Sequence, residues 1–250
     1  PSWHPMLAGI GTAVFFLALT VKWTIPSLIG AVFALVSILR WLWESDPAPS
    51  GKLHDIGGNI QLPDYMSGSR SHSWWSMVVL MLVDGSIFAC LIFTFYYLWT
   101  ISQSGFPPTG LELPLVVPSL LAIIAWVASA GVVAFAERSL STTRSFSAAL
   151  LSAMALLWSA FAFSLYALLE TNLRPQMHGF ASTSYTMVLW QGLHVVVLTL
   201  MGGYTLARAW AGMIDAKRRN VFDNTRIMWY YCAAQGVLAL VVLHSPRFAS

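Results

Sequence analysis

One ionisable side chain, Asp84, lies near the middle of a long apolar segment, Trp74–Trp99, and is well placed to do chemistry. Asp84 follows Trp74 by ten residues, so in a helix it would lie about 15 Å along the axis, near the middle of a bilayer. A carboxylate at that depth costs about 2.5–3.5 kcal/mol on insertion scales. Such a residue is therefore a candidate functional group.

The residues one helical turn from Asp84 are all apolar: Leu80, Met81, Ile87 and Phe88. The carboxyl must therefore meet a polar group from another segment, meet water or lipid headgroup atoms, or stay protonated because burial disfavours its charged form. Two interpretations stay open. One is a neutral acid hydrogen-bonded between helices, and the other is a carboxyl that exchanges protons or reacts with inhibitors.

His194 lies in the middle of a later apolar segment, with Gln191 one helical turn before it. An imidazole can ligate haem or a metal, but such centres usually need several imidazoles that converge. The other histidines fall in loops or at segment ends: His4, His54, His72, His178 and His244. We therefore predict that Gln191 and His194 are interhelical polar residues, and that this chain holds no metal and no cofactor of its own.

Arg40, Trp41 and Glu44 close the second apolar segment. They form either an ordinary interfacial anchor or a site for a phospholipid headgroup, because Arg pairs bidentately with phosphate. The sequence contains no nucleophile elbow, Walker loop or HExxH motif, so we predict no catalytic residues.

The composition indicates a polytopic helical membrane protein. Hydrophobic residues make up 57% of the 250 residues and charged residues only 9%, against about 25% charged residues in a soluble domain. The net charge of +3 comes from scattered basic residues, so we predict no nucleic-acid partner. Cys90 and Cys232 both lie inside apolar segments and imply neither a disulfide framework nor a zinc site.

The pattern predicts an all-α fold with seven transmembrane helices. Two spans fall in residues 1–45, a polar loop on the cytoplasmic side covers 46–73, and five spans fall in 74–250. The predicted spans are Pro5–Trp23, Pro26–Trp43, Trp74–Trp99, Pro114–Phe135, Phe146–Leu169, Tyr185–Gly212 and Ile227–Leu243. The first two are joined by only Thr24 and Ile25, which predicts a tight helical hairpin.

The basic residues predict the orientation. Ten lie on the side of the N-terminus: Arg40, Lys52, Arg70, Arg138, Arg144, Arg208, Lys217, Arg218, Arg219 and Arg226. The other side has three, namely Lys22, Arg174 and Arg247. The positive-inside rule then places the N-terminus in the cytoplasm and the C-terminus outside.

Over essentially its whole length the chain resembles subunit III of the haem–copper (cytochrome c type) terminal oxidases. The resemblance rests on motifs in one order: Pro1-Ser2 with Pro5-Met6-Leu7, Arg40-Trp41-Leu42-Trp43-Glu44, Val83-Asp84 with Phe88, Phe93 and Phe95, Phe106-Pro107-Pro108-Thr109-Gly110-Leu111, Gln191-Gly192-Leu193-His194-Val195, and Trp229-Tyr230-Tyr231. The chain also departs from the family. Asp84 stands where the family has a carbodiimide-reactive Glu, Val83 replaces a Ser, and Gln191 replaces a His. Cys232 and Gln235 stand where the family has His and Asp, and the family's His-rich N-terminal segment is missing.

The resemblance implies a non-catalytic core subunit of a proton-pumping oxidase. In the family, haem and copper lie in subunits I and II, and subunit III packs against subunit I. Two helices splay from the other five around a cleft that holds phospholipids. The resemblance thus implies a cleft-facing Asp84 that supports proton uptake, structural phospholipids, cytochrome c or quinol as electron donor, and a bacterial plasma membrane. Family members also occur fused behind subunit I, which would explain a sequence that begins without methionine.

Other classes of membrane protein remain as alternatives. A small proton-coupled transporter could use Asp84 as its coupling carboxyl, but neither inverted repeats nor an interrupted helix is visible. An accessory chain of a nitric-oxide reductase is a second alternative, although those relatives generally lack the first two helices. A retinal receptor would need a Lys in the seventh span, and Ile227–Leu243 has none.

Overall fold

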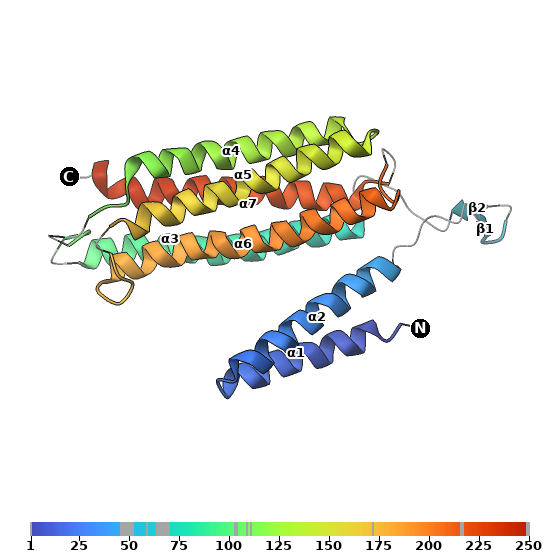
Figure 1. Ribbon diagram of the computed structural model, residues 1–250, viewed down its shortest axis with the longest axis horizontal. Helices are drawn as coiled ribbons and strands as arrows, with labels where there is room; N and C mark the ends of the chain where they lie inside the picture. Colours follow the sequence, from blue (N-terminus) through green and yellow to red (C-terminus); the bar gives the residue numbers. More distant parts are fainter. Residues whose placement is uncertain are drawn as a thin grey trace. The chain divides into compact units, whose positions relative to one another are not determined.

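The computed structural model describes residues 2–45, 53–58, 60–63, 71–102, 105–108, 110, 112–171, 173–215 and 218–248. These residues form seven α-helices, a pair of short strands and a 3-10 turn: α1 (His4–Thr20), α2 (Thr24–Ser45), β1 (Leu53–Asp55), β2 (Gln61–Pro63), α3 (His72–Ile101), α4 (Val116–Arg138), α5 (Thr143–Leu169), α6 (Gly179–Trp210), α7 (Asn220–His244) and η1 (Ser245–Phe248). The chain divides into two compact units, residues 1–66 and 67–250. The helices and their order are shown in Figure 1.

Six of the described helices, α2 to α7, are long and apolar enough to cross a membrane. The predicted all-α membrane fold is therefore confirmed, and the chain is a multi-pass membrane protein. The first predicted span differs in length, because α1 has 17 residues and ends at Thr20, three residues before the predicted end at Trp23. At 1.5 Å per residue it is about 26 Å long, slightly less than a typical hydrocarbon core.

Helices α6 and α7 begin six and seven residues before their predicted starts, at Gly179 and Asn220. The hydropathy pattern located the apolar middles of these helices but not their first turns. The 46–73 segment, predicted as a polar loop, contains the antiparallel strands β1 and β2, in which His54 pairs with Leu62. Several residues used in the predictions lie outside the described residues: Pro1, Lys52, Arg70, Thr109, Leu111 and Lys217.

The first unit contains the predicted hairpin of α1 and α2. The buried residues of both helices are small and recur mainly three or four positions apart: Ala8, Gly11 and Ala18 on α1, and Ser27, Gly30, Ala34 and Ser37 on α2. A Cβ on Gly30 would lie 2.6 Å from the backbone nitrogen of Phe15, so the two backbones are in direct contact. Small residues at this spacing let membrane helices approach closely.

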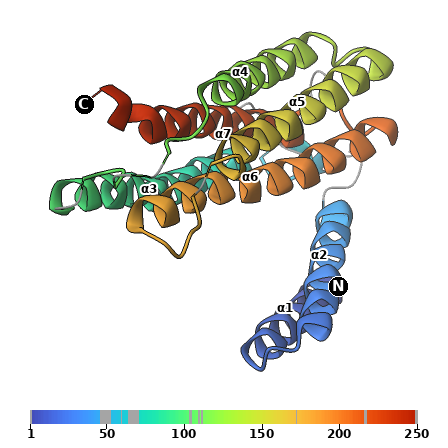
Figure 2. The same cartoon turned by 60° about the vertical axis from the view of Figure 1, so that its left-hand side comes forward.

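The second unit is a five-helix bundle. Helix α7 packs against α3, α4 and α6, and α5 packs against α4 and α6. Helix α3 packs mainly against α6 and α7. In Figures 1 and 2, α4 and α5 lie together on one side of α7, and α3 lies beside α6. This arrangement brings residues of α3, α6 and α7 together.

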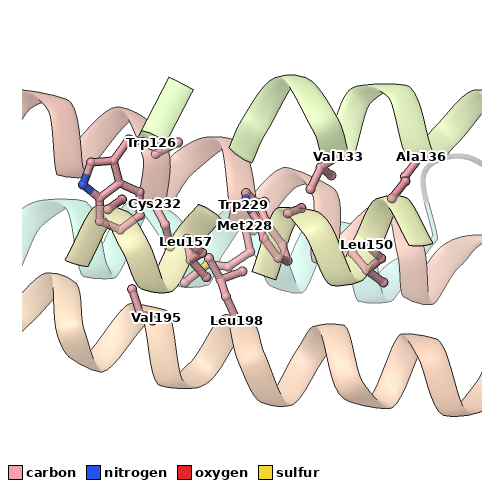
Figure 3. Packing of buried hydrophobic residues seen from close by; sticks show 14 of the residues in the cluster. Trp126, Val133, Ala136, Leu150, Leu157, Val195, Leu198, Met228, Trp229 and Cys232 are labelled. Carbon is pink, nitrogen blue, oxygen red and sulfur yellow. The ribbon is translucent and has the colours of Figure 1, made fainter. Parts of the chain in front are cut away.

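The core of the bundle is apolar and contains two fully buried tryptophans, Trp126 on α4 and Trp229 on α7. In Figure 3 they lie among residues of α5 and α6, including Leu157 and Leu198. Gly236 allows this packing, because a Cβ there would lie 2.4 Å from the indole of Trp126. The Trp229 indole N–H donates to Ser129 Oγ over 3.2 Å, so its polar atom is satisfied.

Candidate functional site

Asp84 is held at the junction of three helices, α3, α6 and α7. Its Oδ1 lies 3.1 Å from Nε2 of His194 on α6. Its Oδ2 accepts hydrogen bonds from the Tyr231 hydroxyl over 2.6 Å and from the Gln235 amide over 2.9 Å, both on α7. The Gln235 amide also donates to the Tyr231 hydroxyl over 2.6 Å. We call Asp84, His194, Tyr231 and Gln235 the Asp84 cluster.

Helix geometry explains how these side chains meet. Tyr231 and Gln235 are four residues apart, so they project from the same face of α7. Gly85, next to Asp84, lets the tyrosine approach, since a Cβ there would lie 3.3 Å from the Tyr231 hydroxyl oxygen. On α6, Gly192 is packed so closely against Phe161 that a Cβ would lie 2.6 Å from its ring. Small residues therefore fix the positions of the helices that carry the cluster.

The cluster is largely shielded from its surroundings. The side chain of Asp84 is 16% exposed and that of His194 is 5% exposed, while Gln235 is 4% exposed as a residue. Burying a charged carboxylate requires partners, and here each of its oxygens has at least one. All four cluster residues lie within helices that are long and apolar enough to cross a membrane.

The hydrogen bonds restrict where the proton of the Asp84–His194 pair can lie. His194 Nδ1 is 2.8 Å from the backbone carbonyl oxygen of Trp190, which only accepts, so Nδ1 carries a hydrogen. Asp84 Oδ2 already accepts two hydrogen bonds. One proton therefore lies between Oδ1 and Nε2, either on the imidazole or on the carboxyl.

Both proton positions leave the pair with no net charge. A carboxylate with an imidazolium and a carboxylic acid with a neutral imidazole each sum to zero. The cost of a lone charge in the bilayer is thereby avoided, because the two groups neutralise each other. Chemically the pair can release one proton and become an anion that the Tyr231 and Gln235 donors stabilise.

The structure unites two of the sequence-predicted site residues and leaves a third apart. His194, predicted as an interhelical polar residue, is the partner of Asp84. Gln191 is 2% exposed, and neither of its side-chain polar atoms has a hydrogen-bond partner among the described residues. Of the environments that the sequence left open for Asp84, the structure shows polar groups from other segments, since three side chains of α6 and α7 reach it.

Arg40, Trp41 and Glu44 lie at the end of α2, and Arg40 and Glu44 are exposed. Glu44 is paired within the hairpin: its carboxylate lies 2.9 Å from His4 Nε2 and accepts a hydrogen bond from Ser2 Oγ over 3.0 Å. These bonds tie the start of α1 to the end of α2. Of the three residues, Arg40 presents a cation outward, as a headgroup site would require.

Tyr231 and Gln235 were not predicted as site residues. The available signal was their spacing, since two polar residues four positions apart in an apolar span share a helix face. The sequence alone did not show that this face meets Asp84, which lies 147 positions before Tyr231.

A second polar cluster, also not predicted, lies at one end of α4 and α7. Arg219 and Arg226 both form ion pairs with Glu137 on α4, and Arg219 also pairs with Asp223 over 2.9 Å. We call these four residues the Glu137 cluster. The hydrogen bonds with Asp223 raise the pKa of Arg219 above its ordinary value, so this guanidinium stays charged at any physiological pH. Asp223 in the first turn of α7 also interacts favourably with the helix dipole.

In the part of the chain that the structure describes, no three His, Cys, Asp or Glu side chains come together as a metal site would require. In comparison with known proteins, no family model matches this sequence, and no curated protein matches it either. The conclusions on function below therefore depend on the site and on the sequence motifs.

Proposed function

We propose that this chain is a non-catalytic core subunit, of the subunit III type, in a proton-pumping haem–copper terminal oxidase of aerobic respiration. In this proposal haem and copper lie in partner subunits, and subunit I is the main contact within a complex that also contains subunit II. The complex would lie in a bacterial plasma membrane, with the N-terminus of this chain in the cytoplasm, as the distribution of basic residues indicates.

The observation that carries the proposal is the convergence of three separate motifs at one site. Asp84 belongs to the motif on α3, His194 to the motif Gln191-Gly192-Leu193-His194-Val195 on α6, and Tyr231 to the motif on α7. Their side chains form one hydrogen-bonded cluster. Motifs that are far apart along the chain thus lie together in space, which supports a shared role.

The division of the chain gives further support. The hairpin of α1 and α2 belongs to one compact unit, and α3 to α7 form the other. A two-plus-five division of the helices is what the resemblance implies. In that arrangement Arg40 would pair with a lipid phosphate, Trp41 would lie at the membrane interface, and Glu44 would hold the hairpin closed through His4.

Asp84 would serve the proton uptake of the complex through its shared proton. The Asp84–His194 pair can release a proton and take it back while its net charge changes only between zero and minus one. A carboxyl with fixed partners is also restricted in its orientation, so a proton would enter and leave on the Oδ1 side.

The assembly can be tested by purification through an affinity tag on this chain in a mild detergent. We expect a coloured preparation with a haem absorption spectrum and a large second subunit. A colourless preparation that contains this chain alone would exclude an oxidase subunit.

The role of Asp84 can be tested in the same preparation with Asp84→Asn. We expect slower proton uptake or a shorter functional lifetime during turnover, because Asn keeps the shape of Asp but cannot exchange a proton. Asp84→Glu, which restores the carboxyl, should recover most of the loss. If Asp84→Asn keeps the normal rate and lifetime, Asp84 serves packing alone.

A proton-coupled transporter remains the second candidate, because ionisable pairs inside the membrane are typical of proton relays. The two proposals differ in their requirements. A transporter would move its substrate in vesicles that contain only this chain, and Asp84→Asn would abolish that transport, whereas an oxidase subunit acts only in its complex.

A further inference from the structure

Two buried glutamines, Gln191 and the Asp84-cluster member Gln235, have side-chain polar atoms without partners among the described residues. Both Oε1 and Nε2 of Gln191, and Oε1 of Gln235, are fully buried and form no hydrogen bond with any described residue. Gln191 is 2% exposed and Gln235 is 4% exposed. Buried polar groups are nearly always paired, and an unpaired one lowers stability. These three atoms therefore need a hydrogen-bonding ligand.

The positions of the two glutamines follow from the contacts between α6 and α7. The hydroxyls of Thr205 and Thr225 are 3.0 Å apart, and Gly202 packs against the ring of Trp229, so the two helices run in opposite directions. Gln191 lies 14 residues before Thr205, and Ala239 lies 14 residues after Thr225, so Gln191 lies opposite Ala239. Ala239 is buried and is one turn from Gln235.

One helical turn of four residues corresponds to about 6 Å along the axis. Two successive hydrogen bonds through a single water oxygen span about the same distance. The offset between the two glutamines along the helix axes is therefore about the length that one bridging water molecule spans.

We propose that Gln191 and Gln235 bind buried water between α6 and α7, next to the Asp84 cluster. Water fits because the unpaired atoms include both a donor and acceptors, and buried waters typically make about three hydrogen bonds. A cation would need more oxygen ligands, and an anion would need a positive group. The water would extend the network of the Asp84 carboxyl through Gln235 by one turn toward Gln191. The proposal concerns this chain alone and does not depend on the oxidase assignment.

The sign of a stability change tests the proposal. Met is close to Gln in shape and has no strong hydrogen-bonding group, so Gln191→Met removes the amide with little change in packing. If water is bound, the substitution deprives it of two partners, and we expect the Tm of the purified protein in detergent to fall by several degrees. If the amide is simply unpaired, Gln191→Met removes an unfavourable group and raises the Tm, which would overturn the proposal.

Leu193→Met is the matched control, because it places Met two residues away on an exposed face of α6. We expect its Tm to stay within about one degree of the parent value, since Leu and Met exchange with little cost.

A second measurement detects the water directly. Infrared spectra in ordinary and ¹⁸O-labelled water should show an isotope-sensitive O–H band in the parent protein and in Leu193→Met, and this band should be lost in Gln191→Met. A band that persists in Gln191→Met would overturn the proposal. A lower Tm with an unchanged band would assign the loss to packing and would overturn it as well.

Discussion

The helices of the two units are held together by different kinds of contact. The helices of the hairpin contact each other through glycine, alanine and serine, and their backbones touch at Gly11 and Gly30. The helices of the bundle are joined by buried aromatic packing and by polar side chains at the Asp84 and Glu137 clusters. Since lipid is as apolar as Leu, membrane helices need either close packing or hydrogen bonds to associate.

This difference explains why the candidate chemistry lies in the bundle. In the hairpin, the polar contacts between helices are made by Ser27 with a backbone carbonyl and, at the open end, by Glu44 with Ser2 and His4. In the bundle, an ionisable pair lies within the membrane-spanning segments, where it affects both stability and proton exchange. The comparison predicts that substitutions in the two units act by different physical mechanisms.

The largest effect is expected from Asp84→Leu in the bundle. It removes the partner of His194 Nε2 and the acceptor of the Tyr231 hydroxyl, together with one of the two hydrogen bonds of the Gln235 amide, and breaking a buried pair on one side costs about 3–5 kcal/mol. Detergent-induced unfolding followed by circular dichroism measures this loss. The double variant Asp84→Leu with His194→Leu should recover part of it, because removing both members of the pair leaves fewer unpaired groups. Equal stability of the parent and Asp84→Leu would show that the cluster contributes nothing.

The second effect concerns the hairpin. Gly30→Val places a side chain where a Cβ already lies 2.6 Å from the Phe15 nitrogen, so α1 and α2 must separate. Overpacking of this kind costs about 1–3 kcal/mol. Disulfide cross-linking between cysteines introduced at Ala8 and Ser37, in a background without Cys90 and Cys232, should fall markedly.

Gly9→Val is the matched control in the hairpin, because a Cβ at Gly9 has no described atom within 4 Å. Cross-linking should stay at the parent level in this control. If both valine variants cross-link equally well, the close packing at Gly30 is not what joins the helices.

The smallest effect is expected in the Glu137 cluster. Glu137→Gln removes the negative charge that Arg219 and Arg226 share, but Asp223 still pairs with both. Since Glu137 is 33% exposed, we expect a loss of about 1 kcal/mol at low salt and a smaller loss at high salt. Thermal unfolding at two salt concentrations measures both values. A loss that does not change with salt would contradict an electrostatic role.

The sequence by itself determined the class of the protein and the number of its helices. Apolar runs of membrane-spanning length persist whatever their neighbours are, because backbone groups in lipid must be satisfied within the helix. The same pattern marked Asp84 as unusual and identified Gln191 and His194 as polar residues within an apolar segment. It located the starts of α6 and α7 less well, since Ser182 and Ser184 on α6 and Asn220 and Asp223 on α7 interrupt the apolar pattern there.

Only the tertiary structure decided which polar residues meet. His194 lies 110 positions after Asp84, and Tyr231 lies 37 positions after His194. The hydropathy pattern does not show how a helix is rotated toward its neighbours. Rotation and register are set by close contacts such as Gly192 against Phe161 and Gly236 against Trp126. These contacts depend on the shapes of both partners, so no single segment of the sequence contains them. For this reason the carboxyl could be found from the sequence, but its partners could not.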